Sequence, residues 1–170
     1  MVRVASIDLG SNSTRMLIAD ITNGNITTIY KEHQVTRMAD KLSESKIISK
    51  EATKRVLKVL AGYFKTINKN NVENIQIVGT AALRDAKNSQ EITQLIEKKF
   101  GFEVDVVSGE EEGVLTSVGV LNSLGSLENF LKLLIISGPM VILGTKWPSI
   151  TSTWIISAPA SSNLLISLPS

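Results

Sequence analysis

Blocks of apolar residues alternate with turn-forming residues over residues 1–35 and predict paired β-strands. Val2 to Asp8 is a short apolar run, Gly10 to Ser13 is a polar turn cluster, and apolar character resumes from Thr14 to Ile21. Asn23-Gly24-Asn25 is a second turn, and Ile26 to Glu32 is rich in β-branched residues. We therefore expect three consecutive antiparallel strands.

The pattern then changes to the period of a helix. Ser49 is suited to an N-cap, and apolar residues recur after it at spacings of three and four. These apolar positions are Ala52, Val56, Val59, Leu60, Phe64 and Ile67. They predict an amphipathic helix of about five turns, and Asn74 to Gly79 is expected to form the next strand.

A further helix, strand and helix are predicted after this strand. Asn88 with Glu91 three residues later resembles a capping box, and Gly101 is a typical helix terminator. Glu103 to Val107 is expected to be a strand, and Gly109 to about Leu121 a helix. The resulting order, β-β-β-α-β-α-β-α, is that of an α/β, ribonuclease H-like (actin-like) fold with a mixed sheet. We assign it to one domain over residues 1–125.

Composition limits the chemistry that is available. The 170 residues include no cysteine and a single histidine, His33. Disulfides, thiolate chemistry, zinc–sulfur sites and a histidine-based metal cluster are therefore excluded. Any metal would be bound by carboxylates and water, which suits Mg²⁺.

Charge and hydropathy bear on partners and location. The chain is 43% hydrophobic and 20% charged, which is typical of a globular protein without a membrane span. Residues 1–128 are neutral overall, and Lys132 and Lys146 supply the net charge of +2, so no basic patch indicates a nucleic acid partner. Asp8 and a glycine turn come too early for a signal peptide, which favours the cytoplasm.

Residues 126–170 form an atypical tail. All four prolines, both tryptophans and eight serines fall within residues 131–170, and no acidic residue follows Glu128. A β-rich segment with proline-marked turns is one interpretation. A frameshifted or truncated start of a second domain, or an artefact, is the interpretation we favour. A membrane hairpin is disfavoured because Leu131 to Leu143 is short and contains Lys132.

The first candidate site is Asp8-Leu-Gly-Ser-Asn-Ser-Thr-Arg15. An aspartate at the end of a buried strand, followed by a glycine that lets the backbone turn around an anion, can hold phosphate and Mg²⁺ together. The loop amides and the hydroxyls of Ser11, Ser13 and Thr14 are candidate phosphate donors. The alternative is a hairpin turn that satisfies its own backbone. Arg15 favours the anion site, because an arginine on the buried side of a strand needs an anion.

The second candidate site follows the strand that ends at Gly79. Ligands bind at the carboxyl ends of strands in mixed α/β sheets, so Thr80 offers a hydroxyl and Arg84 a forked donor to phosphate. The alternative is a surface ion pair between Arg84 and Asp85.

The third candidate site is Ser108-Gly109 with the glutamates 110–112. The helix dipole favours acidic residues in a first turn, so a solvated cap is the ordinary interpretation. One of the three could instead activate water. Its neighbours would raise its pKa and the helix terminus would lower it, so composition leaves the outcome open.

These three segments, in this order, resemble the exopolyphosphatase / guanosine pentaphosphate phosphatase family over residues 1–128. The resemblance implies a Mg²⁺-dependent hydrolase of terminal phosphoanhydrides, with Asp8 near the metal and Glu112 as the catalytic base. Arg37 resembles a residue of a further family segment, in which Ala39 and Lys41 replace frequent glycines. The implied substrate-binding residues are Gly10, Ser11, Asn12, Ser13, Thr14, Arg15, Arg37, Thr80 and Arg84.

The resemblance stops near Leu134. The family's second phosphate loop, Asp-Ile-Gly-Gly-Gly-Ser-Thr-Glu, is expected there, but residues 133–140 read Leu-Leu-Ile-Ile-Ser-Gly-Pro-Met. The metal-binding carboxylate of the second domain is therefore missing. A disrupted reading frame explains this together with the change in composition, and a genuine short paralogue is the alternative.

We thus expect hydrolysis of a terminal phosphate from polyphosphate or guanosine pentaphosphate. Glu112 would deprotonate water, the Asp8 loop and Mg²⁺ would hold the phosphate, and Arg84 would stabilise the developing charge. A kinase of the same fold and a non-catalytic phosphate-binding half-module are the alternatives. The sequence leaves a homodimer open.

Overall fold

The computed structural model describes residues 1–124, 154–156 and 164–166. The chain divides into two compact units, Met1–Val118 and Gly119–Ser170. The described part of the second unit is an antiparallel pair, β6 (Trp154–Ile156) and β7 (Leu164–Ile166). Our other interpretations of residues 126–170, including the second phosphate loop, lie outside the described residues. Within those that are described, no helix is long and apolar enough to cross a membrane.

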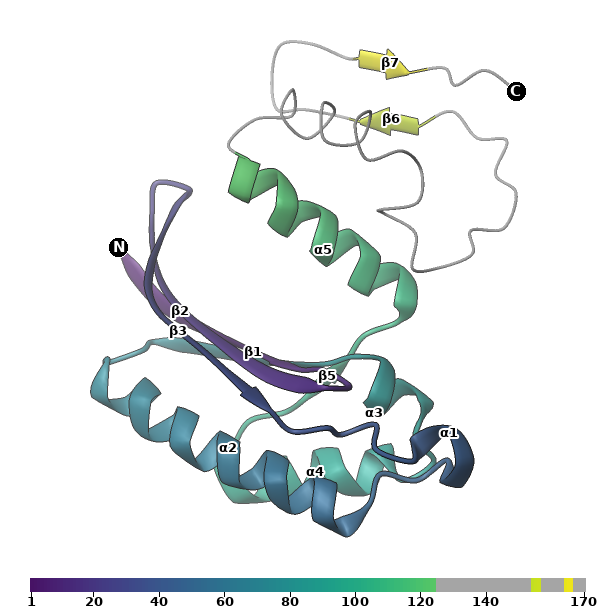
Figure 1. Ribbon diagram of the computed structural model, residues 1–170. Helices are drawn as coiled ribbons and strands as arrows, with labels where there is room; N and C mark the ends of the chain where they lie inside the picture. The colour runs from purple at the N-terminus through teal and green to yellow at the C-terminus, as the bar shows by residue number, and fades with distance from the viewer. Residues whose placement is uncertain (125–153, 157–163, 167–170) are drawn as a thin grey trace. The chain divides into compact units, whose positions relative to one another are not determined.

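The first unit is built on a five-stranded mixed sheet with the order β3-β2-β1-β4-β5 (Figure 1). Its strands β1, β2 and β3 pair antiparallel, whereas β1 with β4 and β4 with β5 pair parallel. This arrangement confirms the predicted mixed sheet. The strands are β1 (Val2–Leu9), β2 (Ser13–Thr22), β3 (Asn25–Val35), β4 (Asn74–Gly79) and β5 (Asp105–Val106).

The strand boundaries differ from the expectation at two places. β3 runs on to Val35, and β5 is only two residues long although Glu103 to Val107 was expected to be extended. The β2–β3 turn is as predicted, since Asn23 and Gly24 adopt positive φ angles of 49° and 79° between the paired residues Thr22 and Asn25.

The helices are α1 (Leu42–Ser45), α2 (Lys50–Lys69), α3 (Ala81–Asp85), α4 (Ser89–Phe100) and α5 (Gly109–Leu124). The three long helices were predicted, whereas α1 and α3 are too short to give a periodic signal. Ser49 caps α2 by accepting a hydrogen bond from the Ala52 amide at 3.1 Å. Figure 1 shows α2 and α4 on one face of the sheet.

The predicted capping box at Asn88 is wrong. Its side chain makes no cap hydrogen bond to α4. Instead, its carboxamide accepts from the Ile48 amide and donates to the Ile48 carbonyl, both at 3.0 Å. Asn88 therefore ties the start of α4 to the segment before α2, a long-range contact that local sequence could not indicate.

The core lies between the sheet and the helices α2 and α4. Alternate residues of β1 point inward, and Ile7 and Leu9 are fully buried there with Ile77 of β4. They belong to one cluster with buried residues of α2 and α4, including Leu60, Tyr63 and Ile96. Because strand side chains alternate, Ser6 and Asp8 point to the other face of the sheet. The buried core thus fixes which face carries polar side chains.

Candidate phosphate-binding site

The parallel part of the sheet brings the three predicted segments together. Leu9 of β1 pairs with Gly79 of β4, and Gly79 pairs with Val106 of β5. The Val107 amide extends this ladder by donating to the Gly79 carbonyl at 3.0 Å. Since all three strands run in the same direction, the Asp8 loop, Thr80 and Ser108 leave the sheet at the same edge.

The loop between β1 and β2 depends on glycine. The Gly10 amide donates to the Ser13 carbonyl at 3.0 Å, and a Cβ on Gly10 would lie only 2.8 Å from that oxygen. Any larger residue would therefore force the loop open. The amides of Ser11 and Asn12 donate no hydrogen bond to the described residues. No group among the described residues competes for these amides, and their binding of an anion stays a prediction.

A second segment holds this loop in place. The Asn12 carbonyl accepts from the amides of Thr36 at 3.0 Å and Arg37 at 2.8 Å, and the Ser11 carbonyl accepts from Ala39 at 2.9 Å. Arg37 itself has a positive φ of 47°. The structure thus brings Arg37 next to the Asp8 loop, although the two are far apart in the sequence.

Arg55 of α2 supports this second segment. Its Nε donates to the Thr36 carbonyl at 2.7 Å, and its Nη2 donates to the Arg37 carbonyl at 3.0 Å. Sequence reasoning missed Arg55, because a basic residue on an amphipathic helix is ordinarily a solvated one. No local signal could have identified it.

Thr14 is not an open phosphate donor. The residue is fully buried, and its hydroxyl lies 3.1 Å from that of Thr36. Its carbonyl accepts a hydrogen bond from the Tyr63 hydroxyl at 2.8 Å. Burial raises the pKa of Tyr63 to about 12, which keeps this hydroxyl a donor. Thr14 therefore anchors the loop to α2, and our expectation of a free hydroxyl is corrected.

Asp8 carries an unpaired oxygen. Its Oδ1 is buried and has no hydrogen-bond partner among the described residues. Burial is the main cause that raises the pKa of Asp8, the Arg15 guanidinium lowers it, and Glu112 raises it further. A carboxylate held with an unused acceptor suits a hydrated cation such as Mg²⁺. The described residues contain no cluster of three or more histidine, aspartate or glutamate side chains that could hold a metal ion.

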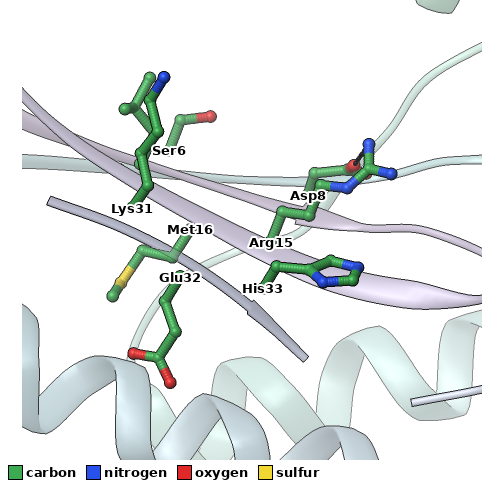
Figure 2. Close-up of a pocket in the computed structure, with 8 residues that line it drawn as sticks. Ser6, Asp8, Arg15, Met16, Lys31, Glu32 and His33 are labelled. Atoms are coloured by element: carbon green, nitrogen blue, oxygen red, sulfur yellow. Dashed lines mark ion pairs between the residues drawn. The ribbon is translucent and has the colours of Figure 1, made fainter. Parts of the chain in front are cut away.

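Arg15 is not on the buried side of its strand. Its side chain is 66% exposed and lies on the same face as Asp8, with 3.9 Å between Nη1 and Oδ2 (Figure 2). The expectation that Arg15 lies on the buried side of its strand is therefore wrong, and the argument for an anion that rested on it no longer applies. Whether Arg15 binds substrate stays a prediction that rests on its position beside Asp8.

Arg84 and Glu112 are brought into direct contact. Arg84 Nη1 donates to Glu112 Oε2 at 3.1 Å and to the Val107 carbonyl at 3.2 Å. The alternative pair with Asp85 is longer, at 3.8 Å. Both side chains stay partly open to solvent, with 32% of Arg84 and 39% of Glu112 exposed. The structure thus places two of the predicted site residues side by side across 28 residues of sequence.

The three glutamates have different environments. Glu111 Oε2 accepts from the Ser108 amide at 2.8 Å, and the Ser108 hydroxyl accepts from the Glu111 amide at 3.2 Å. This is a reciprocal capping box, and the Ser108 hydrogen bonds lower the pKa of Glu111. Glu110 is exposed, and its side chain makes no hydrogen bond or ion pair with the described residues. Of the three glutamates, only Glu112 contacts Arg84. This contact distinguishes the candidate base, Glu112, from Glu111, which caps the helix.

Thr80 lies at the edge but is engaged with β1. Its amide and its hydroxyl both approach the Leu9 carbonyl, at 3.4 Å and 3.5 Å. Gly79 before it has no room for a side chain, since a Cβ there would meet Leu83 at 2.5 Å. The close packing of α3 on β4 sets the direction in which Arg84 leaves the helix.

The comparisons with known proteins agree with this architecture. The model of the Ppx/GppA phosphatase family matches residues 17–135. A putative exopolyphosphatase of Haemophilus influenzae is 33% identical over 120 residues, which are 71% of this chain and 37% of that protein. A guanosine-5'-triphosphate,3'-diphosphate pyrophosphatase of Vibrio cholerae is 37% identical over 123 residues, 72% of this chain and 25% of that protein.

The solved structure of an Aquifex aeolicus Ppx/GppA family member superposes with a TM-score of 0.68 at 34% identity. It covers 73% of this chain and 40% of that one. This likeness confirms the predicted actin-like fold. The chain spans 25% to 37% of the length of these two curated relatives. Because the family model matches most of its residues, the chain belongs to the Ppx/GppA phosphatase family.

Proposed function

We propose that this chain supplies one side of the active site of a phosphoanhydride hydrolase that releases terminal phosphate from polyphosphate or guanosine pentaphosphate. The observation that carries the proposal is the contact between Arg84 and Glu112 at the edge where β1, β4 and β5 end. The names of the two curated relatives, an exopolyphosphatase and a guanosine nucleotide pyrophosphatase, support both substrate classes.

Glu112 acts as the general base. Its Oε2 accepts a hydrogen bond from Arg84 Nη1 at 3.1 Å, and a carboxylate held in this way can accept a proton from water. The 39% exposure of its side chain leaves room for a water molecule on the side away from Arg84. Glu111 cannot take this role, because its carboxylate is occupied at the Ser108 amide.

Arg84 stabilises charge on the phosphoryl oxygens. Its Nη1 is committed to the Val107 carbonyl and Glu112, so the guanidinium is oriented before substrate arrives. The remaining N–H groups can donate to an anion in the forked geometry that suits phosphate. Such preoriented donors contribute most of the catalysis in phosphoryl transfer.

The Asp8 loop binds the terminal phosphate. The Ser11 and Asn12 amides have no partner in the described part of the chain, and a concave run of free amides binds anions. Asp8 would hold Mg²⁺ through its unpaired Oδ1. When bound, the ion neutralises charge on phosphate oxygens. Arg37 lies on the segment that supports this loop and would contact the same phosphate.

The proposal is tested in a chimaera in which Met1–Val118 replaces the corresponding domain of a full-length family member. We expect phosphate release that falls by ~10²–10⁴ in Glu112→Gln, because the amide keeps the shape but accepts no proton. Glu110→Gln is the matched control and should be nearly silent. Equal turnover by the Glu112 variant and the parent chimaera would refute the assignment of the base. Binding of phosphate without any release in the parent chimaera would favour a non-catalytic binding module.

A further inference from the structure

A second surface adjoins the Asp8 loop on the face of the sheet that α2 and α4 do not cover (Figure 2). It is an open cavity of about 360 Å³ over β1, β2 and β3. Two cross-strand rows line it, because Asp8, Arg15 and His33 are paired in register, as are Ser6, Leu17 and Lys31. We call this surface the β-face strip.

The β-face strip carries unpaired positive charge. Lys31 and His33 are exposed, and the side chain of neither residue makes a hydrogen bond or ion pair with the described residues. Arg15 is held only by the 3.9 Å contact with Asp8. Glu32 borders the cavity, but Figure 2 shows its side chain directed away from Lys31, and it accepts from the Tyr30 hydroxyl at 3.0 Å. Of these basic side chains, only Arg15 has a carboxylate partner among the described residues, namely Asp8.

The strip is continuous with the loop that we assign to the terminal phosphate. Neighbouring strands lie about 4.8 Å apart, so His33 is two strand spacings, or about 10 Å, from Asp8. One phosphate cannot contact both ends of such a strip. A chain of linked phosphates can, and each of its units carries the negative charge that Lys31 and His33 lack as a partner among the described residues.

We propose that Lys31 and His33 form a subsite for the phosphate groups that follow the terminal one in an extended phosphate chain. The inference rests on the proposed function, because it takes the Asp8 loop as the binding site of the terminal phosphate. It adds two specificity-determining residues that lie on β3 and take no part in the chemistry. Arg15 links this subsite to the loop.

The test is equilibrium binding to the 170-residue chain, with orthophosphate, tripolyphosphate, long-chain polyphosphate and guanosine pentaphosphate as the probes. We expect affinity to rise with chain length. The double variant Lys31→Gln/His33→Gln should lose about fivefold to tenfold in affinity for long-chain polyphosphate, as an exposed ammonium contact and an exposed imidazole contact are removed, and should keep its affinity for orthophosphate. Lys54→Gln/Lys58→Gln removes two exposed charges from α2 and should change neither.

The outcomes separate this inference from the proposed function. Equal losses for polyphosphate and guanosine pentaphosphate would show that the strip binds phosphates common to both, and a loss for polyphosphate alone would show that it selects the inorganic chain. Affinity that ignores chain length, or an equal loss in the α2 control, would overturn the subsite even if Glu112→Gln still abolished hydrolysis in the chimaera. Circular dichroism spectra of all variants establish that a loss of affinity is not a loss of fold.

Discussion

Replacing Asp8 by asparagine should stabilise the free protein and weaken its binding of phosphate with Mg²⁺. Asp8 Oδ1 is buried without a partner, and burial is the main cause of the raised pKa of this carboxyl. A raised pKa means that the folded state penalises the charged form. Asparagine keeps the shape of the side chain and removes its charge. The folded chain then no longer bears the cost of burying a charged carboxylate, and the proposed metal site loses its negatively charged ligand.

The size of the gain follows from the exposure of the side chain. A buried acceptor without a partner costs about 1–3 kcal/mol, and more when it is charged. Asparagine still leaves a polar atom at this position, so the substitution removes only the part of the cost that comes from the charge. The Asp8 side chain is 41% exposed, so solvent screens part of this cost and we expect Asp8→Asn to raise the free energy of unfolding by about 0.5–1 kcal/mol at pH 7. This corresponds to a rise in Tm of roughly 2–4 °C. Urea unfolding followed by circular dichroism measures it.

The pH dependence has a definite sign. The carboxyl of Asp8 is charged in both states above its raised folded pKa, where its penalty is fully present. Below the unfolded value of ~4 it is neutral in both states, so the advantage of Asp8→Asn should disappear as pH falls toward that value. A less stable Asp8→Asn variant at pH 7 would show that the carboxylate makes a favourable contact in the folded chain, and would refute the reasoning.

Asp20 provides a matched control of opposite sign. Its two oxygens accept from Arg3 Nε at 2.7 Å and Nη2 at 2.9 Å, and these hydrogen bonds lower the pKa of Asp20. The stabilising effect of this carboxylate is therefore present at neutral pH and is lost as pH falls through its lowered pKa. Asp20→Asn should destabilise the chain at pH 7 and leave phosphate binding unchanged.

Three further predictions concern the site and its support. Arg84→Lys in the chimaera should lower kcat/KM despite the retained charge, because the forked geometry is lost; an unchanged kcat/KM would favour a surface ion pair instead. Arg55→Ala should lower the free energy of unfolding by about 1–2 kcal/mol, because two charge-assisted hydrogen bonds are lost. In the same urea unfolding assay, replacing the exposed Lys54 by alanine should change the free energy of unfolding by no more than about 0.5 kcal/mol. The 170-residue chain alone should release no phosphate from polyphosphate in the presence of Mg²⁺, because residues 133–140 contain no acidic residue that could act as a second ligand of the ion. Phosphate release that is abolished by Glu112→Gln would contradict this prediction.

The sequence alone determined the order of the long elements and the segments that carry chemistry. Apolar runs bounded by turn residues, the Ser49 cap and the glycines at 24 and 101 act over a few residues, so their signals are local and were read correctly. The same holds for Gly10, whose need for a close turn follows from the loop itself. Resemblance to a family then singled out Glu112 from three adjacent glutamates.

Only the tertiary structure decided which of these residues come into contact at the site and which stabilise the surrounding fold. Parallel pairing of β1, β4 and β5 joins the Asp8 loop to Arg84 and Glu112, and no local pattern encodes that alignment. The same packing buries the Thr14 hydroxyl against Thr36 and turns Arg15 outward, against our expectation for both. Side-chain burial depends on contacts between segments that are distant in sequence, and a strand's alternation shows two faces without showing which one the helices cover.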